Sequence, residues 1–387
     1  MAKKKKNRQF RADFRKNRTP KARETQWTRK FHAEGADPQN DTTHGERISG
    51  KGDFTRKRTV RGVEVNDDST GQNVLLEVDT TICRPGRVLS VHGLSSTVEA
   101  EDGTLVQCAT RRILKTLTTD QRHVVAAGDR VWFRPSGEQE GIIERIEPRH
   151  GVLSRTSRGR QHILVANVDQ LVIVSSAAEP YLKPNLIDRF LVTAEKMHFR
   201  ALICINKVDL VDVASLLPLV GVYSQMGYEV LLISALTGQN VDRLRQRLVG
   251  RQSVVSGQSG VGKSSLLNAV EPGLGLRVSA VSEETQKGRH TTTTARVLRL
   301  ATGGYVVDTP GVRQFQLWDV IREEVAGFYR DIRPFVSLCR YPDCTHTHED
   351  YCAVKDAVAD GWLDARRYES FCHLAGEDGD LAIGAVE

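Results

Sequence analysis

The sequence predicts an α/β domain with a mostly parallel sheet, a small β-barrel before it, and a helical segment rich in cysteine and histidine after it. Apolar β-branched runs alternate with amphipathic segments from about residue 163 onward, as in doubly wound sheets. Shorter alternating runs, divided by Gly and Asp-Gly turns, precede that region, and a cluster of cysteines and histidines follows it. We place the segments at residues 1–75, 76–155, 156–316 and 317–387.

The first segment, residues 1–75, is a basic arm without apolar periodicity. Residues 1–60 contain 18 lysines and arginines against 7 acidic residues, a net charge of +11, whereas the whole chain carries +7. Such blocks are typically disordered and seek polyanions, so we predict a disordered arm that contacts nucleic acid; a solubility tail is the alternative. Residues 1–30 lack the apolar stretch of a secretory signal but also fit an organelle transit peptide.

Residues 76–155 predict a five-stranded barrel. The stretch GRVLSVHGLSSTVEAEDGTLVQCATRR, residues 86–112, contains short runs of alternating polarity. Five strands at this spacing fit an OB-type barrel, a platform that often binds single-stranded or structured nucleic acid. A generic β-module fits the same pattern.

Residues 156–316 alternate between strands and helices. ILVANVDQLVIVSSA and ALICINKVDL predict strands, and NLIDRFLVTAEKMHF and VASLLPLVGVYSQMG predict helices between strands. No run of about 18 apolar residues occurs, so no membrane span is predicted. The seven cysteines are an odd number, which favours a reducing compartment and a metal site over a disulfide framework.

The stretch GQSGVGKSS, Gly257–Ser265, fits a phosphate-binding loop. It follows the apolar pair Val254-Val255 and precedes a helix start, which is the context that the motif requires. Its glycines let backbone amides face phosphates, and the helix N-terminus adds positive charge. We expect Lys263 to reach the β- and γ-phosphates and Ser264 to bind Mg²⁺. The loop residues are Gly257, Gln258, Ser259, Gly260, Val261, Gly262, Lys263, Ser264 and Ser265.

The tetrapeptide Asn206-Lys207-Val208-Asp209 ends a predicted strand and fits a guanine-reading turn. The Asp209 carboxylate can accept from the ring N–H and the 2-amino group of guanine, whereas adenine would leave it unpaired. The Lys207 stem can pack over the base, and backbone amides at Ser234-Ala235 can meet the guanine carbonyl oxygen. The tetrapeptide alone also fits a plain helix-preceding turn, but beside a phosphate loop it favours GTP and GDP.

Two later segments fit nucleotide-sensing switches. In Asp308-Thr309-Pro310-Gly311, the carboxylate of Asp308 suits water-mediated contact with Mg²⁺, and the Gly311 N–H suits the γ-phosphate. The stretch GRHTTTT should supply a threonine that binds Mg²⁺, and we assign Thr292. Because Val312 follows Gly311, where a glutamine could orient the attacking water, His290 is the candidate for that role; a surface histidine is the alternative.

The base-reading turn precedes the phosphate loop, which reverses the usual order. A ligand site depends on which strand ends meet in space, so a circular permutation keeps the site and moves the termini. In this order, the strand that ends at Asp308 leads almost directly into the C-terminal segment. We therefore predict a nucleotide-controlled docking device rather than a metabolic enzyme.

The stretch CRYPDCTHTHEDYC, residues 339–352, fits a structural zinc site. The pattern C-x₄-C-x-H-x₅-C offers three thiolates and one imidazole, from either His346 or His348. Buried free cysteines beside surface histidines are the alternative. No open coordination position is implied, so the metal is assigned a folding role. The remaining cysteines are predicted to be core or incidental residues: Cys83, Cys108, Cys204 and Cys372.

In this order, the motifs resemble the RsgA (YjeQ) family of circularly permuted GTPases of small-ribosomal-subunit biogenesis. The resemblance covers about residues 80–375 and rests on six segments: Gly128–Val131, Asn206–Asp209, Gly257–Ser265, Gly288–Thr293, Asp308–Phe315 and the cysteine cluster. It implies an OB-fold, a permuted P-loop GTPase domain and a helical zinc-binding domain in series. It also implies His290 as the hydrolytic histidine and the zinc ligands Cys339, Cys344, His346 and Cys352.

The resemblance further implies Mg²⁺-dependent GTP hydrolysis that the small subunit stimulates, coupled to late maturation of that subunit and release of the factor. The expected partners are the small ribosomal subunit and its rRNA, without a membrane, and we expect a cytoplasmic monomer. The arm before residue 76 is longer than the family suggests and is interpreted as an extra rRNA contact. The alternatives are a GTP-dependent RNA-modifying or tRNA-handling enzyme, which needs chemically active cysteines, and an RNA-binding protein with an inactive nucleotide fold. The intact Lys263, Ser264 and Asp308 argue against the latter.

Overall fold

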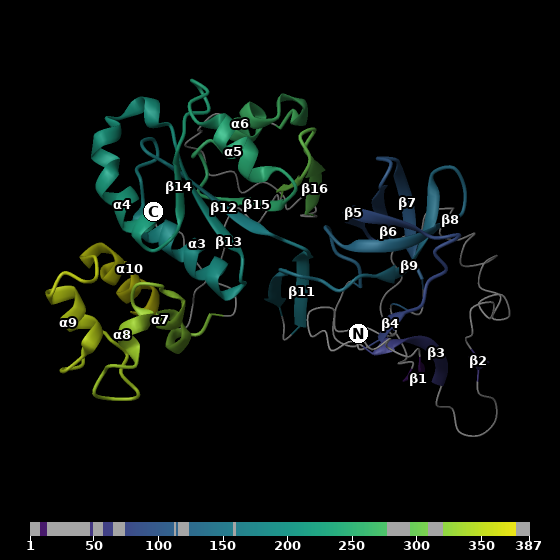
Figure 1. Cartoon of the computed structure of the whole chain (residues 1–387), viewed down its shortest axis with the longest axis horizontal. Coiled ribbons are helices and arrows are strands. Elements are labelled where there is room, and N and C mark those ends of the chain that lie inside the picture. Colours follow the sequence, from purple (N-terminus) through teal and green to yellow (C-terminus); the bar gives the residue numbers. More distant parts are fainter. Residues whose placement is uncertain are drawn as a thin grey trace, which may run out of the picture. The chain divides into compact units, whose positions relative to one another are not determined.

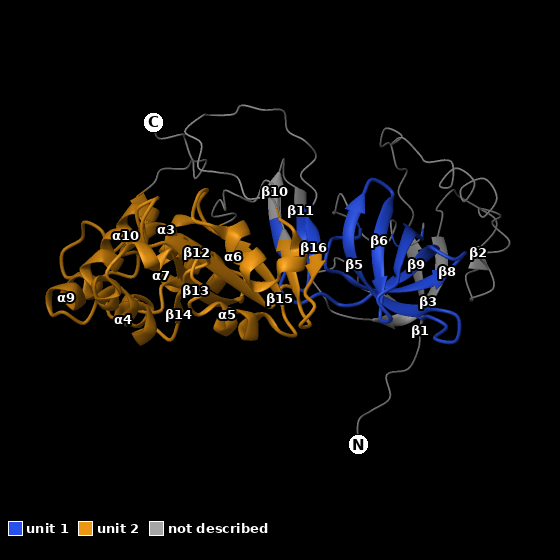
Figure 2. Cartoon of the chain, turned by 90° about the horizontal axis from the view of Figure 1, so that it is seen from above, with its two compact units in different colours: residues 1–167, 294–297 blue, residues 168–293, 298–387 orange. Residues whose placement is uncertain are grey.

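The computed structural model describes residues 8–13, 47–48, 57–64, 74–111, 114, 124–157, 160–276, 295–308 and 320–376. The chain divides into two compact units (Figure 2). One comprises residues 1–167 with 294–297, and the other comprises residues 168–293 with 298–387. In the part of the chain that the structure describes, no helix is both long and apolar enough to cross a membrane.

The first unit contains a closed five-stranded barrel, with its strands in the order β5-β6-β7-β9-β8. The pair β7–β9 is parallel, and the other pairs are antiparallel, so the predicted OB-type barrel is confirmed. Gly86 pairs with both Ala100 and Val131, where the barrel closes; a Cβ there would lie 2.9 Å from the Glu99 carbonyl oxygen. The strands are β5 (Arg84–His92), β6 (Ser95–Ala100), β7 (Leu105–Thr110), β8 (Arg130–Pro135) and β9 (Glu140–Ile146).

The basic arm differs from its prediction because parts of it form strands. β1 (Arg8–Asp13) pairs antiparallel with β3 (Lys57–Glu64) along its whole length, and β2 (Arg47–Ile48) and β4 (Val74–Leu76) also pair with β3. The prediction rested on charge and on the lack of apolar periodicity. Strand pairing needs neither, since it is made by backbone groups and favoured by β-branched residues, which β3 contains in KRTVRGVE.

An antiparallel hairpin of β10 (Leu153–Ser157) and β11 (Arg160–Val165) follows the barrel. The predicted boundary between residues 155 and 156 falls inside this hairpin, whereas the compact units divide after Asn167. The sequence pattern indicates where strands and helices begin to alternate, but it does not predict to which compact unit a hairpin belongs.

The second unit is built on a sheet with the order β14-β13-β12-β15-β17-β16. The pairs β12–β13, β13–β14, β12–β15 and β15–β17 are all parallel, as the alternation predicted. The central strands are buried over nearly their whole length, as expected where helices cover both faces. The strands are β12 (Gln170–Ser176), β13 (Arg200–Asn206), β14 (Glu229–Leu232), β15 (Gln252–Ser256), β16 (Arg296–Arg299) and β17 (Tyr305–Asp308).

The helices of the sheet region match the predicted segments. α3 (Pro184–Lys196) begins with a proline at its first position, which needs no N–H there, and its apolar residues at helical spacing face the core. The segment VASLLPLVGVYSQMG, predicted as one helix, is a 3₁₀ turn, Val213–Leu216, followed by α4 (Leu217–Gln225). α5 (Val241–Leu248) and α6 (Lys263–Val270) complete the set.

The C-terminal helices, residues 320–376, pack against α3 in the same compact unit (Figure 1). Val192 of α3 shares their apolar core, and Arg330 and Glu195 form an ion pair across this contact. After a 3₁₀ turn at Arg322–Glu324, the helices are α7 (Val325–Phe328), α8 (Arg333–Val336), α9 (Ala353–Ala359) and α10 (Ala365–Gly376).

Candidate functional site

The carboxyl ends of β12, β13 and β15 meet at one edge of the sheet. Ser176 at the end of β12 is in register with Asn206 at the end of β13, and the loop after β15 begins at Gly257. In open α/β sheets, ligands bind outside this edge. The reversed chain order therefore still brings the base-reading turn and the phosphate loop to the same place.

The phosphate loop has a positive φ at all three of its glycines, Gly257, Gly260 and Gly262, and at two of them the surroundings also leave no room for a Cβ. Gly257 and Gly262 have φ values of 149° and 88°, which L side chains rarely adopt. A Cβ on Gly257 would lie 2.0 Å from the Val174 carbonyl oxygen, and one on Gly262 would lie 2.5 Å from Asn206 Nδ2. Val261 between them is 2% exposed and packs into the core of the sheet. The packing of Val261 into the core and the close contacts at the two glycines therefore fix the conformation of the loop.

The Lys263 side chain folds back over this loop. Its Nζ donates to the carbonyl oxygens of Gly257 and Gln258 at 2.7 and 2.6 Å. Lys263 is also the first residue of α6, so its ammonium group and the helix N-terminus place positive charge on the same side. Ser264 and Ser265 follow in the first turn of α6 and are partly exposed. The arrangement suits an anion at this edge.

Asn206 connects three of the predicted motifs. It is 1% exposed; its Nδ2 donates to the Val261 carbonyl oxygen at 2.9 Å, and its Oδ1 accepts from the Ala235 N–H at 3.1 Å. One side chain of the base-reading turn is therefore hydrogen-bonded to both the phosphate loop and the loop after β14. The sequence placed Asn206 in the site, but this bridging role depends on a contact between residues far apart in the chain.

The rest of the base-reading turn offers groups to a ligand. Asp209 is exposed, and Val208 is buried beneath it. Lys207 has a left-handed backbone, and its Nζ donates to the Glu179 carbonyl oxygen. Buried Ser234 accepts through Oγ from the Thr237 N–H at 3.1 Å, which shapes the loop after β14. An exposed carboxylate beside a fixed turn suits paired N–H donors on one ligand edge.

The segment that follows β12 lies beside the base-reading turn, although no motif predicted it to belong to the site. The Ala177 N–H donates to the Asn206 carbonyl oxygen at 2.8 Å, and Glu179 accepts from Lys207. Residues 177–179 thus border the base-reading turn. Their position directly after an apolar strand of a parallel sheet was the signal that could have identified them.

The predicted switch residues lie mostly outside the described residues. This applies to His290, Thr292 and Gly311, and to the side chain of Asp308. The backbone of Asp308 ends β17, which runs parallel to β15 with Val307 opposite Val254. The end of β17 is therefore at the same sheet edge as the start of the phosphate loop.

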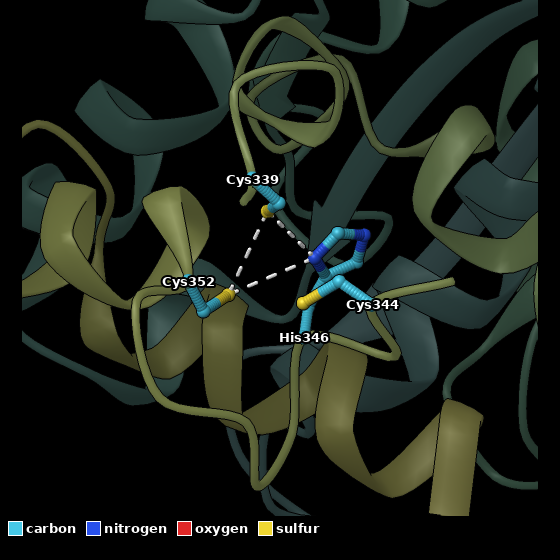
Figure 3. A group of neighbouring side chains, drawn as sticks. All are labelled: Cys339, Cys344, His346 and Cys352. Carbon is cyan, nitrogen blue, oxygen red and sulfur yellow. Dashed lines mark hydrogen bonds between the residues drawn. The ribbon is translucent and has the colours of Figure 1, made fainter. Parts of the chain in front are cut away.

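The cysteine cluster lies among the C-terminal helices and forms one group of converging side chains (Figure 3). The distances are 3.3 Å from Cys339 Sγ to His346 Nδ1, 3.9 Å from Cys339 Sγ to Cys352 Sγ, and 3.7 Å from Cys352 Sγ to His346 Nδ1. With Cys344, all four ligand atoms lie within 4.8 Å of one another. Two thiolates on a tetrahedral zinc ion with bonds of about 2.3 Å lie roughly 3.8 Å apart, so the donor set fits Zn²⁺.

His346, rather than His348, is the histidine of this group. The His346 ring is buried, whereas the His348 side chain is 79% exposed. Burial lowers the pKa of His346, which favours the neutral imidazole that a metal needs. The Tyr368 hydroxyl donates to the His346 carbonyl oxygen at 2.9 Å and ties the loop to α10.

Three of the other cysteines are core residues, as predicted: Cys83, Cys108 and Cys204 are buried. Burial raises the pKa of Cys83 to about 11 and that of Cys108 to about 12. A thiol held protonated in this way is a poor nucleophile. None of these residues lies in the metal-ligating group of the described chain.

Comparison with known proteins connects these features to one family. A family model described as RsgA GTPase matches residues 146–318. The protein from Chlorobaculum parvum named small ribosomal subunit biogenesis GTPase RsgA is 39% identical over 301 residues, which cover 75% of this chain and 96% of that protein. A protein of the same name from Ectopseudomonas mendocina is 41% identical over 298 residues, covering 75% and 84% of the two chains.

Two solved structures are similar to this chain. YjeQ from Thermotoga maritima has a TM-score of 0.64 and 36% identity, and the match covers 76% of this chain and 98% of that one. YloQ, described as a circularly permuted GTPase, has a TM-score of 0.61 and 29% identity, and the match covers 80% and 100% of the two chains.

Proposed function

The chain belongs to the RsgA GTPase family, and from that premise we propose that it hydrolyses GTP in the biogenesis of the small ribosomal subunit. The observation that carries the proposal is the position of Asn206, whose side chain bonds both the phosphate loop at Val261 and the loop after β14 at Ala235. This contact supports a single guanine-nucleotide site formed from segments in permuted order.

The phosphate loop and α6 hold the triphosphate in this proposal. The Lys263 ammonium, which donates to two loop carbonyls, transfers its hydrogen bonds to the β- and γ-phosphates. Backbone N–H groups around Gly260 and Gly262 contact the phosphates, and Ser264 Oγ holds Mg²⁺. Mg²⁺, held there by Ser264, would offset the charge that develops during phosphoryl transfer.

The base is read at the other end of the site. Asp209 accepts from two guanine N–H groups, the stem of Lys207 covers the base plane, and the Ala235 region faces the guanine carbonyl oxygen. The exposure of Asp209 and the fixed left-handed turn at Lys207 support this assignment. Discrimination is strong because an adenine would leave the carboxylate without partners.

The switch residues sense the γ-phosphate. His290 orients the attacking water, Thr292 binds Mg²⁺, and Asp308 reaches Mg²⁺ through water, while the Gly311 N–H meets the γ-phosphate. The parallel pairing of β17 with β15 supports the place of Asp308.

The metal site has a structural role in this proposal. Cys339, Cys344, His346 and Cys352 together supply four protein ligands, which is a closed set for Zn²⁺. When bound, the metal cross-links the loop between α8 and α9. A closed set gives no support to the alternative of an RNA-modifying enzyme with reactive cysteines.

The small subunit and its rRNA are the proposed partners, and the basic arm supports this, since residues 1–60 carry a net charge of +11. Such a block of like charges attracts a polyanion. The barrel adds no excess of positive charge at its cross-strand arginines: Arg87 stands opposite both Arg130 and Glu99, and Arg145, 5.5 Å from the Trp132 ring, is paired with Glu147.

The guanine assignment is tested by Asp209→Asn. The new amide can donate to the extra carbonyl of xanthine and can no longer accept from two N–H groups, so GTP affinity should fall about ten-fold or more, while XTP affinity rises. Binding of fluorescent GTP and XTP analogues measures both. Asp212→Asn is the matched control, since that exposed side chain only accepts from the Ala214 N–H. An unchanged GTP-to-XTP preference in Asp209→Asn would contradict the proposed function.

A further inference from the structure

Exposed tyrosines flank an exposed arginine beside the cysteine cluster. We call Leu338, Arg340, Tyr341 and Tyr351 the Tyr–Arg surface. Leu338, Tyr341 and Tyr351 are 66%, 45% and 68% exposed, and Arg340 is exposed as well. Large apolar groups gathered in this way mark interaction sites. Neither the nucleotide site nor the metal site uses these side chains.

The cysteine cluster brings the two halves of the Tyr–Arg surface together. Arg340 directly follows Cys339, Tyr351 directly precedes Cys352, and the two sulfurs lie 3.9 Å apart. The Arg340 guanidinium consequently lies over both rings, 5.0 Å from Tyr351 and 5.9 Å from Tyr341. The chain's own arginine demonstrates that these ring faces accept a guanidinium cation.

The backbone of Tyr351 is an unusual one for an aromatic residue. Its φ of 58° lies in the left-handed region, which costs a bulky side chain energy. Such conformations concentrate at functional sites. The same loop contains a second left-handed residue, His346, and Tyr351 directly precedes the buried Cys352. The conformation therefore belongs to the loop that brings the cysteines together, and it leaves the Tyr351 ring 68% exposed.

The charges around the surface decide the class of partner. Asp343 and Asp350 are exposed, and among the described residues neither has a hydrogen bond or an ion pair. Residues 320–376 hold 7 lysines and arginines against 10 acidic residues, a net charge of −3. RNA would bring phosphates to this acidic surface and be repelled, whereas a Lys/Arg-rich peptide would be attracted and could stack on the rings.

We propose that the Tyr–Arg surface binds a Lys/Arg-rich segment of a partner protein. Cations of the partner stack on the ring surface of Tyr341 and Tyr351 that stays exposed beside Arg340, and Asp343 and Asp350 pair with neighbouring cations at the rim. The proposal goes beyond GTP hydrolysis and does not depend on it, because the surface lies on the loop between α8 and α9 and needs no nucleotide.

The test is fluorescence polarisation with the full chain and four labelled probes: octa-arginine, octa-lysine, octa-glutamate and a single-stranded uridine oligonucleotide. The variants are Tyr341→Ala combined with Tyr351→Asn, where asparagine keeps the left-handed backbone, and Asp343→Asn combined with Asp350→Asn. Trp362→Ala is the matched control, since Trp362 is a 78% exposed aromatic in the turn between α9 and α10, outside the Tyr–Arg surface. Measured zinc content verifies that each variant retains the metal. Every variant also keeps the basic arm, so binding of a probe to the arm does not differ between them.

Octa-arginine should bind the unmodified chain, and each tyrosine should contribute about five-fold, on the scale of a cation–π contact. The tyrosine double variant and the aspartate double variant should both bind more weakly, and Trp362→Ala should not differ. Equal octa-arginine affinity in the tyrosine variant and the unmodified chain would overturn the proposal. A loss of oligonucleotide binding without loss of octa-arginine binding would also overturn it and assign the surface to RNA.

Discussion

Arg367 is at the centre of a buried ion cluster that joins α10 to α3, and its removal should destabilise the second unit. It is 3% exposed, bonds Asp331 through Nε and Nη2 at 2.9 Å each, and forms an ion pair with Asp188 of α3. Its guanidinium also lies 4.4 Å from the Tyr329 ring. In Arg367→Met, Asp188 and Asp331 both lose the cation that they share. The Asp188 carboxylate is 1% exposed, so water cannot replace that cation.

Breaking a buried pair by removing one partner costs about 3–5 kcal/mol, and we expect Arg367→Met to lose this amount. Asp188→Asn should behave differently. Burial raises the pKa of Asp188 despite the opposing influence of Arg367, so the site does not favour its charge strongly. The amide still accepts from the Tyr223 hydroxyl, which is 2.9 Å away, and one cation then faces one carboxylate. We expect a loss below about 1 kcal/mol.

The sign of the pH dependence follows from the same cluster. Without Arg367, the pKa of Asp188 rises further above its unfolded value. The penalty on the folded state grows as the pH rises from the unfolded pKa to the raised folded pKa of Asp188, and protonation at lower pH relieves it. The stability difference between Arg367→Met and the unmodified chain should therefore narrow from mildly alkaline to mildly acidic buffer.

The assay is urea unfolding followed by helical circular dichroism, because α3 to α10 all belong to the second unit. Arg366→Met is the matched control: that neighbouring side chain is 49% exposed and pairs with Asp364 at the surface, so its loss should stay within about 0.5 kcal/mol. Equal losses for Arg367→Met and Arg366→Met would refute the reasoning. So would a loss for Asp188→Asn as large as that for Arg367→Met.

Three further predictions concern the nucleotide and metal sites. Asn206→Ala leaves the Val261 carbonyl and the Ala235 N–H without their partner, each worth about 1–3 kcal/mol, so GTP affinity measured with a fluorescent analogue should fall at least about ten-fold; an unchanged affinity would contradict the bridging role. His290→Ala should keep GTP affinity and lower the hydrolysis rate about 100-fold, as measured by phosphate release, and lost binding would make His290 structural instead. Cys352→Ser should release zinc and lower the urea midpoint of the helical signal; equal metal content and midpoint would argue against this ligand set.

The sequence predicted those parts of the fold that local pattern determines. β12 and β13 are mostly apolar runs, and two of the three glycines of the phosphate loop, Gly257 and Gly262, lie where a Cβ would clash. The donor set at Cys339–Cys352 follows from spacing, which leaves His346 and His348 open; the family resemblance implied His346, and the buried loop conformation agrees with it. Strand pairing in the basic arm was missed because backbone hydrogen bonds leave little trace in a charged sequence.

Contacts between distant residues were beyond the pattern. Arg367 and Asp188 lie on separate segments, each of which is an ordinary amphipathic helix by periodicity. Their pairing follows only from the packing of α10 on α3. The bridging of two loops by Asn206 is a similar case, since its residue type and motif were evident but its two partners were not.

The central claim is that this chain is a GTPase whose activity the small ribosomal subunit stimulates. The most direct measurement is phosphate release from GTP by the purified chain, alone, with isolated small subunits and with large subunits, with Lys263→Ala as the inactive control. The account predicts a large stimulation by small subunits only, absent in Lys263→Ala. Equal rates with and without small subunits, or equal stimulation by both subunits, would contradict it.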